Sequence, residues 1–328
     1  MNTMDNSRIE ELQKPVTDLR CTFIKLTSPY RESLWKYCLK ITGNAVDAED
    51  LLQDTLLRAF AKLGYLGQAL NLKAYLFKMA TNIWIRQQAR KRLLESDDYL
   101  DWQQESAENE LSHELGEMME WLVELLPPKQ RVAFILSSSF DFGNKEIAEL
   151  MGTSEGTIKS YLHRARKIVA GAVANGIATK KKTILHGEAE DQVIDRYIQA
   201  FNKADVKGLL SLLDENATTC IIGDWEEYGK GQIEANSLHF WSLESSDRFA
   251  VYGELDDIPV IFGFRKNEEG KTALREVIRL SHDGRLIHSV DWYFFAVDFI
   301  KYAAEKLNVP YIVQGYQYEA EPDTGAVL

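Results

Sequence analysis

The chain of 328 residues has no long run of apolar side chains. Its longest candidate, Trp292–Ile300, is short and contains Asp298. A membrane-spanning helix needs about 20 consecutive apolar residues, so none is expected. The N-terminal stretch MNTMDNSRIEELQK lacks the apolar core of a secretory signal. We therefore expect a cytoplasmic protein that does not contact a membrane.

Cysteine is scarce as well. Cys21, Cys38 and Cys220 are odd in number and far apart, which fits neither a disulfide framework nor a zinc site. Reduced thiols in the cytosol are the simplest interpretation, and no metal or cofactor is expected.

Enzyme motifs are also missing: the chain has no P-loop, no H-E-x-x-H pattern and no two-metal carboxylate pattern. Residues 152–156, GTSEG, match the G-x-S-x-G pattern of serine hydrolases, but that motif follows a strand. The preceding segment, Lys145–Met151, has the apolar spacing of a helix. Ser154 is therefore expected to cap a helix, and no catalytic residue is assigned.

The net charge of −12 argues against nucleic-acid binding, because phosphate contacts need lysine and arginine. The distribution of charge points the other way. From Glu95 to Leu126 no lysine or arginine interrupts a run of acidic residues. Basic clusters flank this run: Arg86, Arg90, Lys91 and Arg92 before it, and Lys159, Arg164, Arg166 and Lys167 after it. This alternation of basic, acidic and basic segments indicates separate modules.

Residues 19–95 have helical periodicity. Leu34, Tyr37, Cys38 and Ile41 define one apolar face, and Gly43-Asn44 breaks that helix. Asp47 is expected to cap the next helix. The acidic run, 96–122, is predicted to be a linker, and 123–175 to be helical again.

The pattern changes at about residue 188. Helical segments at 189–203 and 205–214 precede β-branched and aromatic segments that predict strands. These strands are Ala217–Ile222, Phe249–Leu255, Ile258–Phe264, Ala273–Ser281 and Leu286–Phe295. The predicted fold is multidomain: two all-α domains followed by an α+β domain.

A helix-turn-helix is predicted over Asn144–Val169. Gly152 stands where the first helix must end in a left-handed turn, and Ser154 where the second begins. The second helix carries basic and polar side chains, as a recognition helix in the major groove does. An ordinary helical hairpin is the alternative.

These motifs resemble the extracytoplasmic-function (ECF) sigma factors over residues 19–175. LPPKQRVAFILSSSFDFGNKEIAELMGTSEGTIKSYLHRARK resembles region four, and DAEDLLQDTLLRAFAKL with AYLFKMATNIWIRQQARKR resembles region two. The tail opens with VIDRYIQAFNKADVKGLLSLLDENATTCI and resembles SnoaL-like domains, whose cone-shaped fold is shared with nuclear transport factor. The implied domains are an N-terminal tail (1–18), region two (19–95), an acidic linker (96–122), region four (123–175), a hinge (176–187), a SnoaL-like domain (188–318) and a tail (319–328).

The resemblance implies a transcription initiation factor whose partners are core RNA polymerase and promoter DNA. The residues that it assigns to core polymerase are Asp47, Glu49, Asp50, Gln53 and Asp54. Those that it assigns to the downstream promoter element are Tyr65, Gln68, Asn71, Asn82, Arg86, Gln87 and Arg90. Those that it assigns to the upstream element are Glu155, Thr157, Lys159, Ser160, His163, Arg164, Arg166 and Lys167. Some family members with such a tail lack a separate anti-sigma partner, which implies that the tail modulates the sigma domains.

The cone is the candidate for a small-molecule pocket. Residues that would line it are Trp225, Tyr228, His239, Trp241, Arg275, Asp291 and Trp292, with His239 and Asp291 as an acid–base pair. The alternative is that these side chains only fill the cone. Two other functions stay open: a transcriptional regulator with a ligand-sensing tail, and an isomerase or hydrolase that uses the cone.

Overall fold

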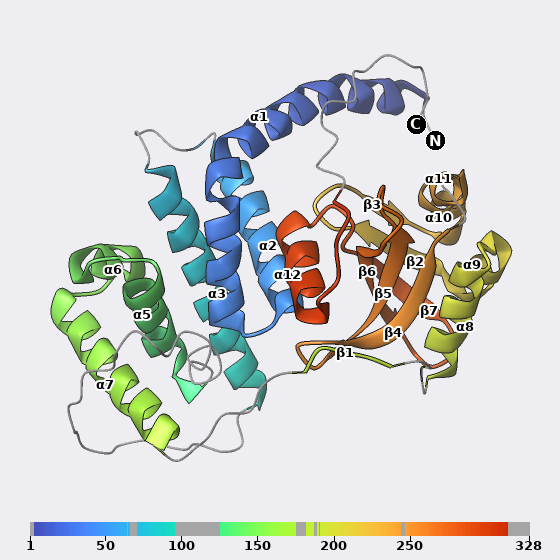
Figure 1. Ribbon diagram of the computed structural model, residues 1–328. Coiled ribbons are helices and arrows are strands. Elements are labelled where there is room, and N and C mark those ends of the chain that lie inside the picture. The colour runs from blue at the N-terminus through green and yellow to red at the C-terminus, as the bar shows by residue number, and fades with distance from the viewer. Residues whose placement is uncertain are drawn as a thin grey trace. The chain divides into compact units, whose positions relative to one another are not determined.

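The computed structural model describes residues 3–63, 65, 71–95, 125–174, 182–186, 189, 191–243 and 247–313. The chain divides into two compact units, Met1–Lys180 and Lys181–Leu328. The first is helical and the second is built around a sheet, which confirms the predicted multidomain fold (Figure 1). Within these described ranges, no helix has the length and apolarity that a bilayer crossing requires.

The first part of the helical unit consists of α1 (Thr3–Thr42), α2 (Ala45–Leu63) and α3 (Leu72–Glu95). The apolar face expected on the first helix is buried: Leu34, Tyr37, Cys38 and Ile41 are all inaccessible to solvent. Helix α1 begins at Thr3, inside the segment expected to be a tail.

The cap of α2 differs from the prediction. Asn44, not Asp47, accepts the hydrogen bond from the backbone N–H three residues on, at 2.8 Å. The Asn44 amide also donates to the Asp47 carboxylate at 2.8 Å. Because Asn44 is the residue just before the helix, its short side chain reaches the exposed amides of the first turn.

The second part of the helical unit consists of α5 (Pro128–Ser139), α6 (Asn144–Met151) and α7 (Glu155–Ala174). It packs against the first part through aromatic rings. Tyr37 and Phe77 stack with centroids 4.9 Å apart, and Phe140, after α5, meets their rings at 5.6 and 5.4 Å. The Arg131 guanidinium donates to the Ile41 carbonyl at 3.0 Å. The two parts of the helical unit, which the sequence pattern assigns to separate domains, therefore pack against each other through apolar side chains.

In the described part of the second unit, the sheet has seven strands in the order β1-β4-β5-β6-β7-β2-β3. Strands β2 and β7 are parallel, and the other neighbours are antiparallel. The strands are β1 (Ile184–Leu185), β2 (Leu213–Ile221), β3 (Glu226–Tyr228), β4 (Phe249–Leu255), β5 (Ile258–Lys266), β6 (Thr272–His282) and β7 (Ile287–Trp292). The helices are α8 (Gln192–Asn202), α9 (Val206–Leu212), α10 (Lys230–Ala235), α11 (Ser237–Leu243) and α12 (Val297–Leu307).

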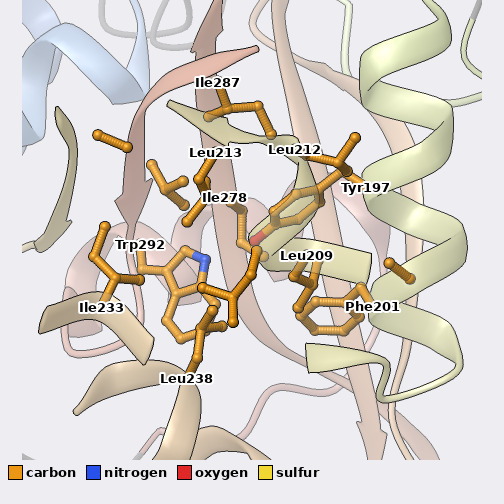
Figure 2. Packing of buried hydrophobic residues seen from close by; sticks show 14 of the residues in the cluster. Tyr197, Phe201, Leu209, Leu212, Leu213, Ile233, Leu238, Ile278, Ile287 and Trp292 are labelled. Carbon is orange, nitrogen blue, oxygen red and sulfur yellow. The ribbon is translucent and has the colours of Figure 1, made fainter. Parts of the chain in front are cut away.

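The five predicted strands and the first two predicted helices are present, which confirms the α+β architecture. Helices α8 and α9 pack on the sheet around a solid apolar core. Figure 2 shows Tyr197, Phe201, Leu209 and Trp292 directed toward one another in this core. Alternation over the last residues of two strands explains the arrangement, because Ala217, Thr219 and Ile221 of β2 and Val290 and Trp292 of β7 are buried.

Strand β1 belongs to the segment expected to be a hinge. Ile184 and Leu185 pair with β4, and the Lys182 amide donates to the Asp257 carboxylate at 2.9 Å. Gly253 makes the close approach feasible: a Cβ there would lie 2.3 Å from the Ile184 carbonyl oxygen. Residues 182–186 are thus the edge of the sheet rather than a free connection, because an edge strand offers unpaired backbone groups to an adjacent segment.

Candidate functional site

The helix-turn-helix has the predicted geometry. Helix α6 ends at Gly152, whose φ of 65° and ψ of 42° are left-handed. The Ser154 hydroxyl accepts the backbone N–H of Thr157 at 3.2 Å and so caps α7. Both local signals are confirmed, because only glycine adopts that turn without strain and a short hydroxyl reaches the amides of the first turn.

Helix α7 separates a buried face from an exposed basic face. Its buried residues are Ile158, Leu162, Ala165, Val169 and Ala172. Of the residues assigned to the upstream element, the exposed ones are Glu155, Lys159, His163, Arg164 and Arg166, and the half-buried ones are Thr157, Ser160 and Lys167. Lys159, His163 and Arg166 stand four and three residues apart, so they form one stripe along the helix. A stripe of this kind can lie along the major groove.

Helix α3 carries a second polar stripe. Asn82, Arg86 and Arg90 are spaced by four residues and are exposed, with Gln87 beside them. Trp84 on the opposite side is buried, as expected for a core residue.

The loop before α3 is described only in part. Tyr65 is 89% exposed, whereas Gln68 lies outside the described residues. The Asn71 side chain accepts the Ala74 amide at 3.1 Å and caps α3. Tyr65 therefore has the freedom to meet a base, while Asn71 has a structural partner.

The acidic start of α2 is exposed in part. Asp47 and Asp50 are exposed, and the Asp54 carboxylate pairs with Arg58 one turn on, at 2.9 Å. Gln53 is half-buried. The surface offers carboxylates with a half-buried amide between them, which suits a basic partner.

Glu49 is a correction to the predicted acidic surface. Its side chain is fully buried and lies 3.1 Å from the Arg31 guanidinium of α1. The helical spacing contains the signal that was missed: Glu49 stands four residues after Ala45 and three before Leu52, both of which are buried. A carboxylate on that face must turn inward and find a cation, and Arg31 supplies it.

Burial also affects the groups next to this pair. It raises the pKa of the Cys38 thiol well above its ordinary value, and the nearby Glu49 charge adds to the effect. The pKa of Tyr37 is raised by burial too, although the hydrogen bond to Thr81 at 2.6 Å opposes the shift. Both groups therefore stay neutral at physiological pH.

The predicted pocket in the tail is not formed. Trp241 and Trp292 are part of the apolar core, and Arg275 is buried with its guanidinium 4.2 Å from the Phe294 ring centroid. Trp225 and Tyr228 are 44% and 65% exposed. The cavity that remains beside Tyr197, Thr219, Ser237 and Trp292 has a volume of about 10 Å³. That volume suits about one water molecule, because the core side chains fill the rest.

The expected acid–base pair is also wrong. Trp292 and Trp241 share the core, so β7 turns the preceding residue, Asp291, to the opposite face of the sheet. His239 is an exposed residue of α11, the helix that contributes Trp241 to the core. The two side chains lie on different sides of the sheet. Among the described residues, no group of three or more histidines, cysteines or carboxylates could hold a metal ion.

Comparison with known proteins identifies the family. The model for Sigma-70 region 2 matches residues 26–93, and the model for Sigma-70, region 4 matches residues 117–169. EcfG, an ECF RNA polymerase sigma factor of Rhodopseudomonas palustris, is 36% identical over 138 residues, which cover 41% of this chain and 75% of EcfG. The chain belongs to the ECF sigma factors. Members of this family are initiation factors rather than enzymes.

Two further proteins are similar to this chain. SigG of Mycobacterium tuberculosis is 30% identical over 238 residues, and the sigma factor described here spans 62% of its length. An NTF2-like protein of Cytophaga hutchinsonii is 16% identical, with a TM-score of 0.26, and the match covers 32% of this chain and 98% of that protein.

Proposed function

We propose that this protein binds core RNA polymerase, directs it to promoters and helps to open the DNA there. One observation supports the proposal above others: α3 and α7 each expose a polar and basic stripe, in a chain with both region two and region four. Two separate DNA-facing helices fit two promoter elements, whereas a simple helix-turn-helix regulator needs one. Such a protein works in the cytoplasm.

Core polymerase is proposed to bind the exposed start of α2. Asp47, Asp50 and Asp54 give this surface a negative charge, and Leu57 beside them is 67% exposed. Charged rims with an apolar centre are common in protein interfaces. The surface therefore fits a basic partner with an apolar contact point.

The test is co-purification with core polymerase. Asp50→Lys together with Asp54→Lys should abolish it, because like charges would then meet across the interface. Glu234→Lys with Glu305→Lys is the matched control, since both glutamates are exposed in the second unit and the charge change is the same. Undiminished binding of the first variant would refute the assignment.

The second unit is proposed to modulate the sigma domains through its surface. The cavity in the described part of its core has a volume of only about 10 Å³, which favours a role of the surface over a ligand in the cone. A tether raises the effective concentration of the two units into the mM range, at which even a weak contact is occupied.

Transcription in vitro with the full chain and with a chain that ends at Lys180 tests this role. Lys180 is the last residue of the first unit, so the shorter chain keeps both sigma regions. A rise in activity on truncation would indicate inhibition by the tail, and a fall would indicate assistance. Equal activity across several promoters and salt concentrations would exclude modulation.

A further inference from the structure

The helical unit buries the carboxylate of Glu49, which cannot itself contact DNA or polymerase because it has no exposed area. The Glu49 side chain has no exposed area, and that of Arg31 is 17% exposed. Their ion pair joins α1 to α2 at 3.1 Å. Removing two charges from water is costly, and apolar side chains of similar volume often stabilise a protein more. Stability alone therefore does not favour glutamate here.

The same carboxylate oxygen has a second partner nearer the surface. Gln53, one turn further along α2, donates its Nε2 hydrogen to Glu49 Oε1 at 2.5 Å. Glu49 Oε1 thus accepts from Arg31 on one side and from Gln53 on the other. Hydrogen bonds to a charged acceptor are short and directional. They connect the interior of α1 and α2 to the half-buried amide.

The position of Gln53 gives this connection a consequence. It stands between Asp50 and Asp54, on the surface proposed for core polymerase. An unrestrained glutamine side chain loses rotamer entropy when a partner binds it. A glutamine already held by Glu49 loses less, so binding is stronger for the same contacts.

We propose that Glu49 is a positioning residue that fixes the Gln53 amide for contact with core polymerase. The inference rests on the proposed function of α2. Glu49 itself touches no partner, and Arg31 holds its carboxylate in place. The exposed aspartates around it attract a basic partner, whereas the buried Glu49 fixes the orientation of the Gln53 side chain.

A double-mutant cycle in the full chain tests the proposal. Glu49→Gln, Gln53→Ala and the double variant are titrated with core polymerase at a temperature where all are folded. Loss of one hydrogen bond to a charged group corresponds to about tenfold in affinity, so each single variant should weaken binding by about that factor. The double variant should bind no more weakly than Gln53→Ala, because Glu49 acts through that side chain.

A stability control separates positioning from damage to the core. Val132→Ala removes buried volume from α5, a helix that contributes neither residue of the ion pair, and lowers stability. Its affinity for core polymerase should match that of the unchanged protein. Arg31→Lys should recover most of the affinity that Arg31→Met loses, because it keeps the positive charge.

The outcomes separate the two hypotheses. If Asp50→Lys with Asp54→Lys binds normally, the proposed polymerase surface is wrong. If that variant loses binding but the losses of Glu49→Gln and Gln53→Ala multiply, only the positioning role is wrong. An unchanged affinity of either single variant, or a loss in Val132→Ala equal to that in Glu49→Gln, also overturns the positioning role.

Discussion

Both units of the molecule bury glutamate side chains, and Glu49 and Glu227 are held differently. Glu49 in the helical unit is paired with a cation and with a side chain beside the surface. Glu227 in the sheet domain is 6% exposed and accepts from the Ser237 amide at 3.1 Å and the Trp225 indole at 3.3 Å. The first links the core to an exposed face, and the second fastens β3 to the start of α11.

This difference extends to the rest of each unit. Helices α3 and α7 present polar and basic stripes to solvent, which suits DNA, whereas α2 presents acidic residues, which suit a basic partner. The sheet domain packs Tyr197, Phe201 and Trp292 in its core, which leaves a cavity of about 10 Å³ beside Tyr197 and Trp292. In the proposed function, the helical unit recognises its partners through exposed side chains. The described part of the sheet domain has a packed core, so its proposed role depends on its surface.

The largest expected effect is on the core of the sheet domain. Trp292→Ala should cost about 3–5 kcal/mol, since it removes a large side chain from a filled interior. Trp225→Ala, at a 44% exposed position, is the control and should cost much less. Hydrogen exchange of the β2 and β7 amides measures both as local opening free energies. Equal losses of opening free energy in the two variants would contradict the proposed difference between the core and the surface of this domain.

A second substitution tests the edge of the sheet. Gly253→Val should cost about 1–3 kcal/mol and displace β1, because its side chain would collide with the Ile184 carbonyl and the Phe262 ring. Tryptic cleavage after Lys182 should become faster. Gly231→Val is the matched control, since a Cβ there meets no neighbour within 4 Å. Identical cleavage rates would mean that β1 does not depend on Gly253.

The recognition helix offers a comparison within one element. Arg164→Ala should relax the choice of one base in the upstream element, at about 1–3 kcal/mol of discrimination. Lys167→Ala should weaken binding to all sequences alike and reduce the salt dependence, as loss of a phosphate contact does. Selection of binding sites with the polymerase holoenzyme measures both. Indistinguishable profiles would contradict separate roles for the two side chains.

The smallest expected effect is a pH dependence in the sheet domain. Burial raises the pKa of Asp291, although Arg279 opposes the shift. The folded state then holds the proton more tightly than the unfolded state, so ionisation of Asp291 destabilises the fold as pH rises above the unfolded pKa. Asp291→Asn should raise the melting temperature at pH 7 and make no difference in strong acid.

Asp283 is the control of opposite sign. Backbone N–H groups of Leu286 and Arg285 lower its pKa, so its ionised form favours the folded state. That contribution is present above the unfolded pKa and is lost as pH falls through the folded pKa. Asp283→Asn should lower the melting temperature at pH 7. The same direction of change in both variants would contradict the two environments.

The helices and the helix-turn-helix could be predicted because their signals are local. Gly152 and Ser154 act within four residues of themselves, and the apolar spacing from Leu34 to Ile41 requires only one helix. Five strands could be predicted for the same reason. Strand β1 could not, because Ile184 and Leu185 form a strand only through their pairing with β4.

The sequence by itself determined the order of the modules, the two polar stripes and the family. Tertiary structure alone decided which polar residues lie inside. Glu49 and Gln53 both belong to the acidic turn of α2, yet Arg31 of another helix makes burial of the first favourable. Trp225 and Trp292 both follow an aspartate, and the sheet leaves the first partly exposed and places the second in the core. The local sequence pattern determines which side chains share one face of a helix or strand. Whether a polar side chain on that face can be buried depends on the partner that a distant segment provides.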